Sequence, residues 1–315
     1  MLVDSLRCSC TPGARLPLTH YSDGGCRRLP MPLPRIAGIL ASVAGDTAHR
    51  DGKITATRVL TCARQVIIED NIAGPLDVLS YNSIYDGILE HAAMQRHAPP
   101  GTYTEVHLPL PGQEPPTLFG VPMEGTIDFL TADLREIHDY KKHSESAQSF
   151  KFEGGGADPE VAAQLNIYRL LLEQCLPAAK IERLVVWHGA MTSANTKTFR
   201  TKQPVPPWFE VRLPLMSEAE IAAIRPNGGD YTVQQIVDAY VRFAAERAGD
   251  RALPTDAEVG LGAGNRSVVV EAPLDLEAAI RAVPLQGRKM WGGKKCSTWC
   301  SVREACDKLE GIARL

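Results

Sequence analysis

The stretch from residue 103 to residue 188 constrains the fold most, because its hydrophobic period changes from two residues to about 3.6 and back. Apolar and polar residues alternate between Tyr103 and Pro111, as they do along a half-buried strand. Two more strand-like segments follow at 120–132 and 135–142. A helical segment with one apolar stripe then occupies 159–175, and a short apolar strand occupies 183–188. This order predicts an α/β fold with a mixed central sheet flanked by helices.

Further helices are predicted on either side of this stretch. Apolar residues recur at helical spacing in four other segments, at 55–70, 80–94, 217–224 and 232–248. Thr55 or Thr57 is placed to cap the first of them, and Ser80 the second. Residues 1–50 contain many Pro and Gly and little periodicity, so we expect a flexible extension there and one domain over 51–315.

Charge and hydrophobicity exclude several classes of protein. The chain has 34 Lys and Arg against 37 Asp and Glu, so any contact with nucleic acid needs a local basic patch. Hydrophobic residues make up 44% of it, which excludes full disorder. No segment approaches the roughly 18 apolar residues of a membrane span, and the first residues lack a secretory pattern. We therefore expect a cytoplasmic chain with no membrane partner, whose eight cysteines are reduced metal ligands or core residues.

The tripeptide Asp139-Tyr140-Lys141 is the first candidate for chemistry. Residues i and i+2 of a strand share a face, so Asp139 and Lys141 should point the same way. A two-residue turn at 133–134 would pair positions whose numbers add up to 267, which puts Asp128 opposite Asp139 at about 5 Å. Two such carboxylates repel unless a cation lies between them, and oxygen ligands suit Mg²⁺ or Mn²⁺. The spacing alone leaves open an ordinary surface hairpin with an exposed ion pair.

Three other residues add to this candidate site. Gln164 and Tyr168 are four positions apart on the predicted helix and so lie on one face. His91 lies late in the helix predicted at 80–94. Taken singly, Tyr168 can be an ordinary core residue, and His91 an ordinary surface or core histidine.

In order along the chain, these elements resemble the motifs of the PD-(D/E)XK nuclease superfamily in its RecB-like branch. The resemblance covers about residues 55 to 310. The matching elements are Gly87 with His91, Gly125-Thr126-Ile127-Asp128, Asp139-Tyr140-Lys141, and Gln164 with Tyr168.

The resemblance implies a restriction-endonuclease-like core and a role for each matching residue. His91, Asp128, Asp139 and the Tyr140 carbonyl would ligate the metal, and Lys141 would activate the water. Gln164 and Tyr168 would hold the site and the bound strand. Glu105 is an additional acid that no motif requires.

The activity implied is that of a Mg²⁺- or Mn²⁺-dependent exonuclease that hydrolyses phosphodiester bonds in DNA, on single strands or duplex ends. Recombination or CRISPR adaptation proteins would be its partners. The alternative is a DNA-end-binding assembly module whose nuclease site is vestigial.

Cysteines near the end of the sequence form a second signal. Cys296, Cys300 and Cys306 are one thiolate short of a tetrahedral site, and Cys62 is a candidate for the fourth. Thiolates select zinc or an iron–sulfur cluster over Mg²⁺, and such a site would stabilise the fold rather than take part in the reaction. Cys175 is a predicted core residue. Cys8, Cys10 and Cys26 would lie in the extension, as incidental thiols or a further metal site.

This arrangement resembles the iron–sulfur branch of the RecB-like nucleases, which includes the AddB nuclease domain and the CRISPR-associated exonucleases. In that branch an early Cys in a Cys-x-Arg context, here Cys62-Ala63-Arg64, joins a late trio to bind a 4Fe–4S cluster. The first gap of the trio is three residues here rather than the usual two, so zinc stays an alternative.

The densest basic run lies just before these cysteines. Cations for phosphates and an indole for base stacking suit single-stranded DNA. A solvated basic face is the other interpretation. The candidate DNA-binding residues are Arg288, Lys289, Trp291, Lys294 and Lys295.

Overall fold

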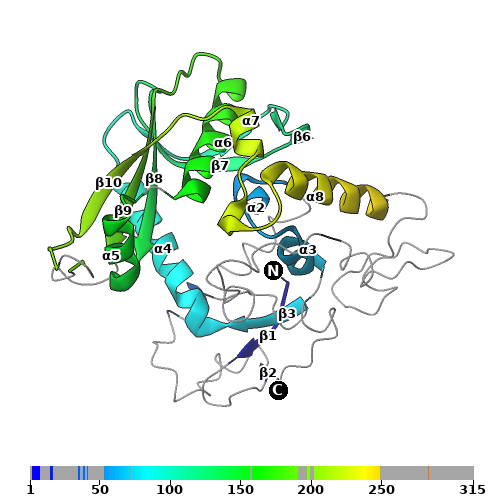
Figure 1. Ribbon diagram of the computed structural model, residues 1–315, viewed down its shortest axis with the longest axis horizontal. Helices are drawn as coiled ribbons and strands as arrows, with labels where there is room; N and C mark the ends of the chain where they lie inside the picture. Colours follow the sequence, from blue (N-terminus) through cyan, green and yellow to red (C-terminus); the bar gives the residue numbers. More distant parts are fainter. Residues whose placement is uncertain are drawn as a thin grey trace.

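The computed structural model describes residues 2–7, 15–16, 35, 38–39, 41, 53–71, 73–156, 158–190, 197–198, 202–248 and 283. These residues form a mixed α/β structure whose central sheet is mostly antiparallel and is flanked by helices (Figure 1). The coarse fold class predicted from the sequence is therefore confirmed.

Five strands make up the central sheet, in the order β10-β9-β8-β7-β4. Strand β8 runs parallel to β9, and the other neighbouring strands are antiparallel. The parallel pair is possible because α5 and α6 lie between β8 and β9 in the chain. The strands are β4 (Tyr103–Leu108), β7 (Gly125–Leu130), β8 (Glu136–His143), β9 (Arg183–Ala190) and β10 (Trp208–Leu213).

Helix α6 (Pro159–Cys175) has the bounds that its apolar stripe predicts. Asp158 occupies its N-cap position and Pro159 its first turn, where a missing N–H costs nothing. Leu165 and Leu171 are fully buried and belong to the same core cluster as Ile127 of β7 and Ile137 of β8. The helix α5 (Glu145–Glu153) precedes it and is capped by Ser144.

The remaining predicted helices are present with one interruption. They are α4 (Val78–Arg96), α7 (Glu218–Ala222) and α8 (Val233–Ala248), with the 3-10 turn η2 (Pro226–Gly228) between the last two. The helix predicted over 55–70 is wrong as a single element, because the chain forms α2 (Ala56–Val59) and α3 (Ala63–Asn71). At the break, the Thr61 hydroxyl donates to the Thr57 carbonyl and the Thr61 N–H to the Arg58 carbonyl, which tightens the turn and ends α2. Thr55 caps α2, as predicted.

The strand predicted over 120–132 is also divided. Strand β6 (Val121–Pro122) pairs with β5 (Thr117–Leu118) in a separate two-stranded sheet, and only Gly125–Leu130 enters the central sheet. Pro122 has no N–H to donate to a ladder, which is consistent with a short edge strand there.

A small sheet of order β2-β1-β3 was not predicted from the sequence. Strand β1 (Leu2–Arg7) pairs antiparallel with β2 (Arg15–Leu16) and parallel with β3 (Ala73–Asp77). Both β1 and β2 lie within the segment expected to be an extension. Helix α4 follows β3 directly and leads from the small sheet to the central one (Figure 1). Among the described helices, none combines the length and the apolar character that crossing a membrane requires.

Candidate metal centre and active site

The hairpin of β7 and β8 has the register that its sequence predicts. Phe129 pairs with His138 and Leu130 with Ile137, so paired numbers add up to 267. The turn is longer than the two residues predicted: the Thr131 N–H donates to the Glu136 carbonyl at 3.1 Å and closes the loop 132–135. Because both loops are centred on the same point, the register is unchanged.

Asp128 and Asp139 are the neighbours in the chain of Phe129 and His138, the pair at the end of this ladder. The Tyr140 N–H donates to Asp128 Oδ2 at 3.2 Å, which anchors the Asp128 carboxylate to the backbone of β8. The charge of Asp139 also acts on Asp128, so the two carboxylates lie close together.

Asp139 is almost fully buried beside the lysine that the strand spacing pairs with it. Asp139 is 2% exposed. Its Oδ1 accepts a hydrogen bond from Lys141 Nζ at 3.0 Å. Oδ2 lies 2.9 Å from the same ammonium but accepts no hydrogen bond from any described residue. A buried carboxylate oxygen with lone pairs to spare is a suitable metal ligand.

Three residues from three elements meet beside Asp139. His91 of α4 lies 3.4 Å from Glu105 of β4, measured from Nδ1 to Oε1. Its Nε2 lies 3.6 Å from Asp128 Oδ2. One ligand atom from each residue lies within 4.8 Å of the others, so the three can hold one metal ion together.

Glu105 is the residue of this site for which the sequence motifs provided no role. In the β4–β7 ladder, Thr104 pairs with Phe129 and Val106 with Ile127, so Glu105 lies opposite Asp128. Glu105 has a φ of 49°, a left-handed backbone conformation that is unusual for a glutamate in a strand. Only the register of β4 against β7, which the sequence does not reveal, places Glu105 in the site.

Charges at the site perturb each other strongly. Burial, followed by repulsion from Asp139, raises the pKa of Asp128 to about 7, against the opposing effect of His91 and Lys141. The hydrogen bond to Glu105 raises the pKa of His91 to about 9, against the effect of burial. Without a cation, the site therefore retains protons that a metal ion would displace.

Lys141 and Tyr168 keep their protons at neutral pH. Burial opposes the charge of Lys141, but the neighbouring Asp139 more than compensates, so the lysine pKa is raised. Burial, with a smaller effect from the Asp139 charge, raises the pKa of the Tyr168 phenol to about 12. Both groups are therefore hydrogen-bond donors in the site.

Helix α6 closes the other side of the site. Gln164 Nε2 donates to the Tyr168 hydroxyl at 2.9 Å, as expected for two residues on one helical face, and lies 3.3 Å from the Thr57 hydroxyl of α2. Gly125 makes room for the Tyr168 ring, since a Cβ at this position would lie 2.9 Å from two ring carbons.

The other predicted site residues fall mostly outside the described part of the chain. Cys62 is half-buried and Cys175 is 8% exposed, and neither forms a disulfide. Burial raises the pKa of the Cys175 thiol, in keeping with a core residue. The predicted residues that lie outside the described part of the chain are Cys8, Cys10, Cys26, Cys296, Cys300, Cys306, Arg288, Lys289, Trp291, Lys294 and Lys295.

One contact brings residue 283 against α3, close in the chain to Cys62. The Arg64 guanidinium, 5% exposed, donates to the Val283 carbonyl through Nε at 3.1 Å and through a terminal nitrogen at 3.0 Å. Residue 283 therefore contacts α3 at Arg64, which follows Cys62 by two residues in the chain.

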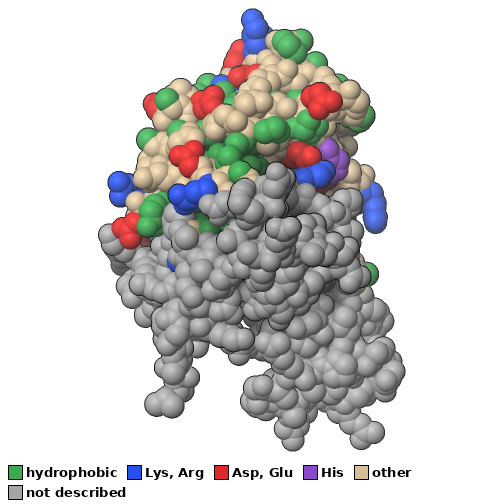
Figure 2. All heavy atoms as spheres, turned by 90° about the vertical axis from the view of Figure 1, so that its right-hand side faces the viewer, with side chains coloured by type: hydrophobic (Ala, Val, Ile, Leu, Met, Phe, Trp, Pro, Cys, Tyr) green, Lys and Arg blue, Asp and Glu red, His purple; other side chains and the backbone are tan. Residues whose placement is uncertain are grey.

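The described surface has no large field of one charge on the face that Figure 2 shows, where acidic, basic and apolar side chains are interspersed. This agrees with the formal net charge of −3.

Comparison with known proteins found only distant structural likeness. No family model matches the chain, and no curated protein matches it significantly. A solved structure described as the crystal structure of SSO0001 is similar over 65% of this chain and 83% of that one, with 13% identity and a TM-score of 0.41. A likeness of this degree says nothing about activity.

Proposed function

We propose that this chain is a metal-dependent deoxyribonuclease of the PD-(D/E)XK superfamily, in its RecB-like branch. The observation that supports this most is the convergence of His91, Glu105, Asp128 and Asp139 from α4, β4, β7 and β8, with Lys141 beside them. Such a set of one imidazole, three carboxylates and one ammonium is the equipment for metal-assisted attack on a phosphodiester. The mixed sheet flanked by helices is consistent with a restriction-endonuclease-like core.

The residues present fit Mg²⁺ or Mn²⁺. Their ligand atoms are mainly carboxylate oxygens, with one imidazole nitrogen and the Tyr140 carbonyl. Among the oxygens is the buried Asp139 Oδ2, which accepts no hydrogen bond from the residues that the structure describes. When bound, the ion would supply a nucleophilic hydroxide and neutralise the charge that develops on the phosphate.

The protein groups then position the reactants. Lys141 keeps its proton, so its ammonium orients Asp139 and donates to the attacking water or to a phosphate oxygen, rather than acting as a base. The Tyr168 hydroxyl accepts a hydrogen bond from Gln164 and still has its own proton to donate. Water attacks the phosphorus, the P–O bond to the leaving nucleotide breaks, and the leaving oxygen takes up a proton.

The substrate in this proposal is DNA, as single strands or duplex ends, and the setting is recombination, repair or CRISPR adaptation in the cytoplasm. A digest of end-labelled single-stranded and duplex DNA by the purified chain tests the activity. We expect degradation with Mg²⁺ or Mn²⁺ and complete loss when EDTA is in excess, with recovery when the metal is restored.

The same digest has an informative negative result. Binding of labelled DNA ends without cleavage, at any concentration of Mg²⁺ or Mn²⁺, would contradict the nuclease and favour a DNA-end-binding module with a vestigial site.

We also propose that Cys62, Cys296, Cys300 and Cys306 bind a 4Fe–4S cluster, with zinc as the alternative. The contact of Val283 with Arg64, two residues after Cys62, supports this, since the 13 residues from Val283 to Cys296 span at most roughly 43–47 Å when extended. The cluster would join the two ends of the domain and stabilise it.

Metal content and optical absorption test this second proposal. We expect a brown protein that contains iron and loses it, together with thermal stability, in Cys62→Ser; Cys175→Ser, in the helix α6, is the matched control and should keep its iron. A colourless wild-type protein with one zinc ion would select zinc, and one with neither metal would contradict the site.

A further inference from the structure

In the part of α4 whose side chains the structure describes, polar side chains contact the central sheet. From Tyr85 to Arg96, none of the described side chains of α4 is buried. Ile88 and Leu89 are 43% and 46% exposed. A helix of this length normally owes its place to an apolar stripe that packs on its neighbours.

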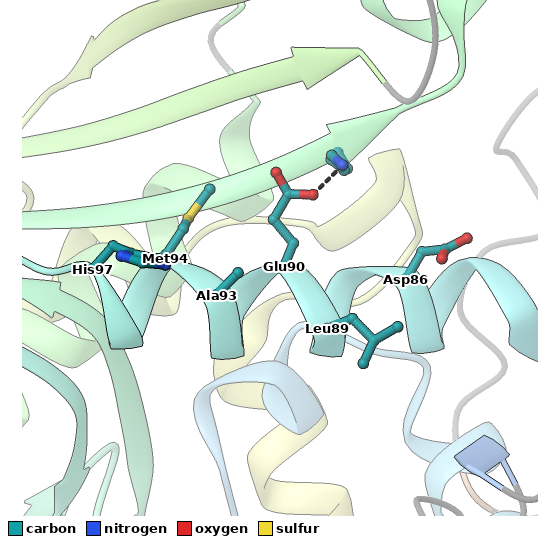
Figure 3. A pocket seen from close by; sticks show the side chains of 7 residues that line it. Asp86, Leu89, Glu90, Ala93, Met94 and His97 are labelled. Carbon is teal, nitrogen blue, oxygen red and sulfur yellow. Dashed lines mark ion pairs between the residues drawn. The ribbon is translucent and has the colours of Figure 1, made fainter. Parts of the chain in front are cut away.

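An open groove of about 700 Å³ lies where this packing would be expected. Figure 3 shows Glu90 and Met94 pointing from α4 toward the neighbouring strand. The side chains that line the groove are those of Asp86, Leu89, Glu90, Ala93, Met94, His97 and Lys142.

One ion pair crosses from α4 to the sheet beside this groove. The Glu90 carboxylate pairs with the Lys142 ammonium of β8, and the two side chains are 25% and 24% exposed (Figure 3). Lys142 follows Lys141 in the strand and so points to the opposite face. The same strand thus directs one lysine into the site and the next to the helix that carries His91.

A second contact holds α4 nearer to its N-terminus. Asp86 pairs with Arg35, whose guanidinium also lies 5.6 Å from the centre of the Tyr85 ring. These contacts tie α4 to residue 35, whereas the Glu90–Lys142 pair lies next to His91 along the helix.

We propose that Glu90 and Lys142 are positioning residues for the metal centre: their ion pair holds α4 on β8 so that His91 faces Glu105 and Asp128. This rests on the metal centre of the proposed function. Metal ligands require placement to a few tenths of an ångström, and the loss of an outer partner typically weakens metal affinity by about 10- to 100-fold.

Mn²⁺ titration of the full chain, followed by electron paramagnetic resonance, tests this. We expect Glu90→Gln and Lys142→Met each to raise the Mn²⁺ dissociation constant about tenfold. The cleavage rate at saturating Mn²⁺ should stay within about twofold of the wild-type rate, because the reacting groups are unchanged. The double exchange of Glu90→Lys with Lys142→Glu should recover most of the affinity.

Glu173→Gln is the matched control, since Glu173 is a 30% exposed carboxylate paired with Arg169 on α6. It should bind Mn²⁺ as the wild type does. Unchanged affinity in both single variants, or a loss of rate that saturating Mn²⁺ leaves in place, would overturn the positioning role. A wild-type chain that binds no Mn²⁺ would overturn the metal centre itself, and the positioning role with it.

Discussion

Replacing Asp139 by Asn should lower the rate of DNA cleavage by about 10³-fold or more while the chain stays folded. Asn has the same shape, but it has no charge and one of its two terminal atoms becomes a donor. The buried Oδ2, which accepts no hydrogen bond from the described residues, would no longer be available as an anionic ligand. Steady-state cleavage of labelled DNA at saturating Mg²⁺ measures the effect, and circular dichroism checks the fold.

The same variant has a second readout that does not depend on activity. Burial and repulsion from Asp139 raise the pKa of Asp128 to about 7. Removing the Asp139 charge should therefore lower the Asp128 pKa, which carboxyl carbon chemical shifts can follow in a metal-free sample. Asp238→Asn, an exposed position on α8, is the control and should change neither quantity. Full Mg²⁺-dependent cleavage by Asp139→Asn would rule out the proposed active site.

Replacing Lys141 by Met should lower the cleavage rate by about 10²- to 10⁴-fold without weakening the binding of Mn²⁺. Methionine keeps most of the aliphatic stem and removes the ammonium, which donates to Asp139 Oδ1 at 3.0 Å. A positive charge next to a metal centre disfavours the cation, so its loss should leave the affinity unchanged or slightly tighter. Mn²⁺ titration and single-turnover cleavage of the same sample separate the two effects.

The comparison with Lys142→Met makes this test specific. Lys141→Met should lose rate at saturating metal, whereas Lys142→Met should lose metal affinity and keep its rate. Equal behaviour of the two variants would contradict the assignment of these neighbours to opposite faces of β8. Weaker Mn²⁺ binding in Lys141→Met would show that the lysine supports the metal rather than the attack.

Local hydrophobic patterns were enough to predict the helix and strands that carry most of the site residues. The apolar stripe of α6 predicted its bounds and the shared face of Gln164 and Tyr168, because a helix repeats every 3.6 residues whatever surrounds it. The alternation in β8 likewise predicted the contact of Asp139 with Lys141. The hairpin register followed from the centre of its turn, even though the loop is longer than expected.

The predictions of secondary structure failed where a side-chain hydrogen bond or pairing with a distant strand overrides the local hydrophobic pattern. The helix predicted over 55–70 is interrupted because the Thr61 hydroxyl bonds back to the turn before it. Strand β3 was missed because its partner β1 lies some seventy residues earlier in the chain, and pairing at that distance leaves no periodic signal in either segment.

The sequence by itself determined which residues of one element share a face, since the period of a strand or helix depends only on the backbone. It therefore determined the pairs Asp139 with Lys141 and Gln164 with Tyr168. Only the tertiary structure decided which elements meet: Glu105 comes opposite Asp128 through the register of β4 on β7, and Glu90 meets Lys142 where α4 crosses β8. Loops of irregular length separate these elements, and the way such loops close depends on the packing of the whole domain.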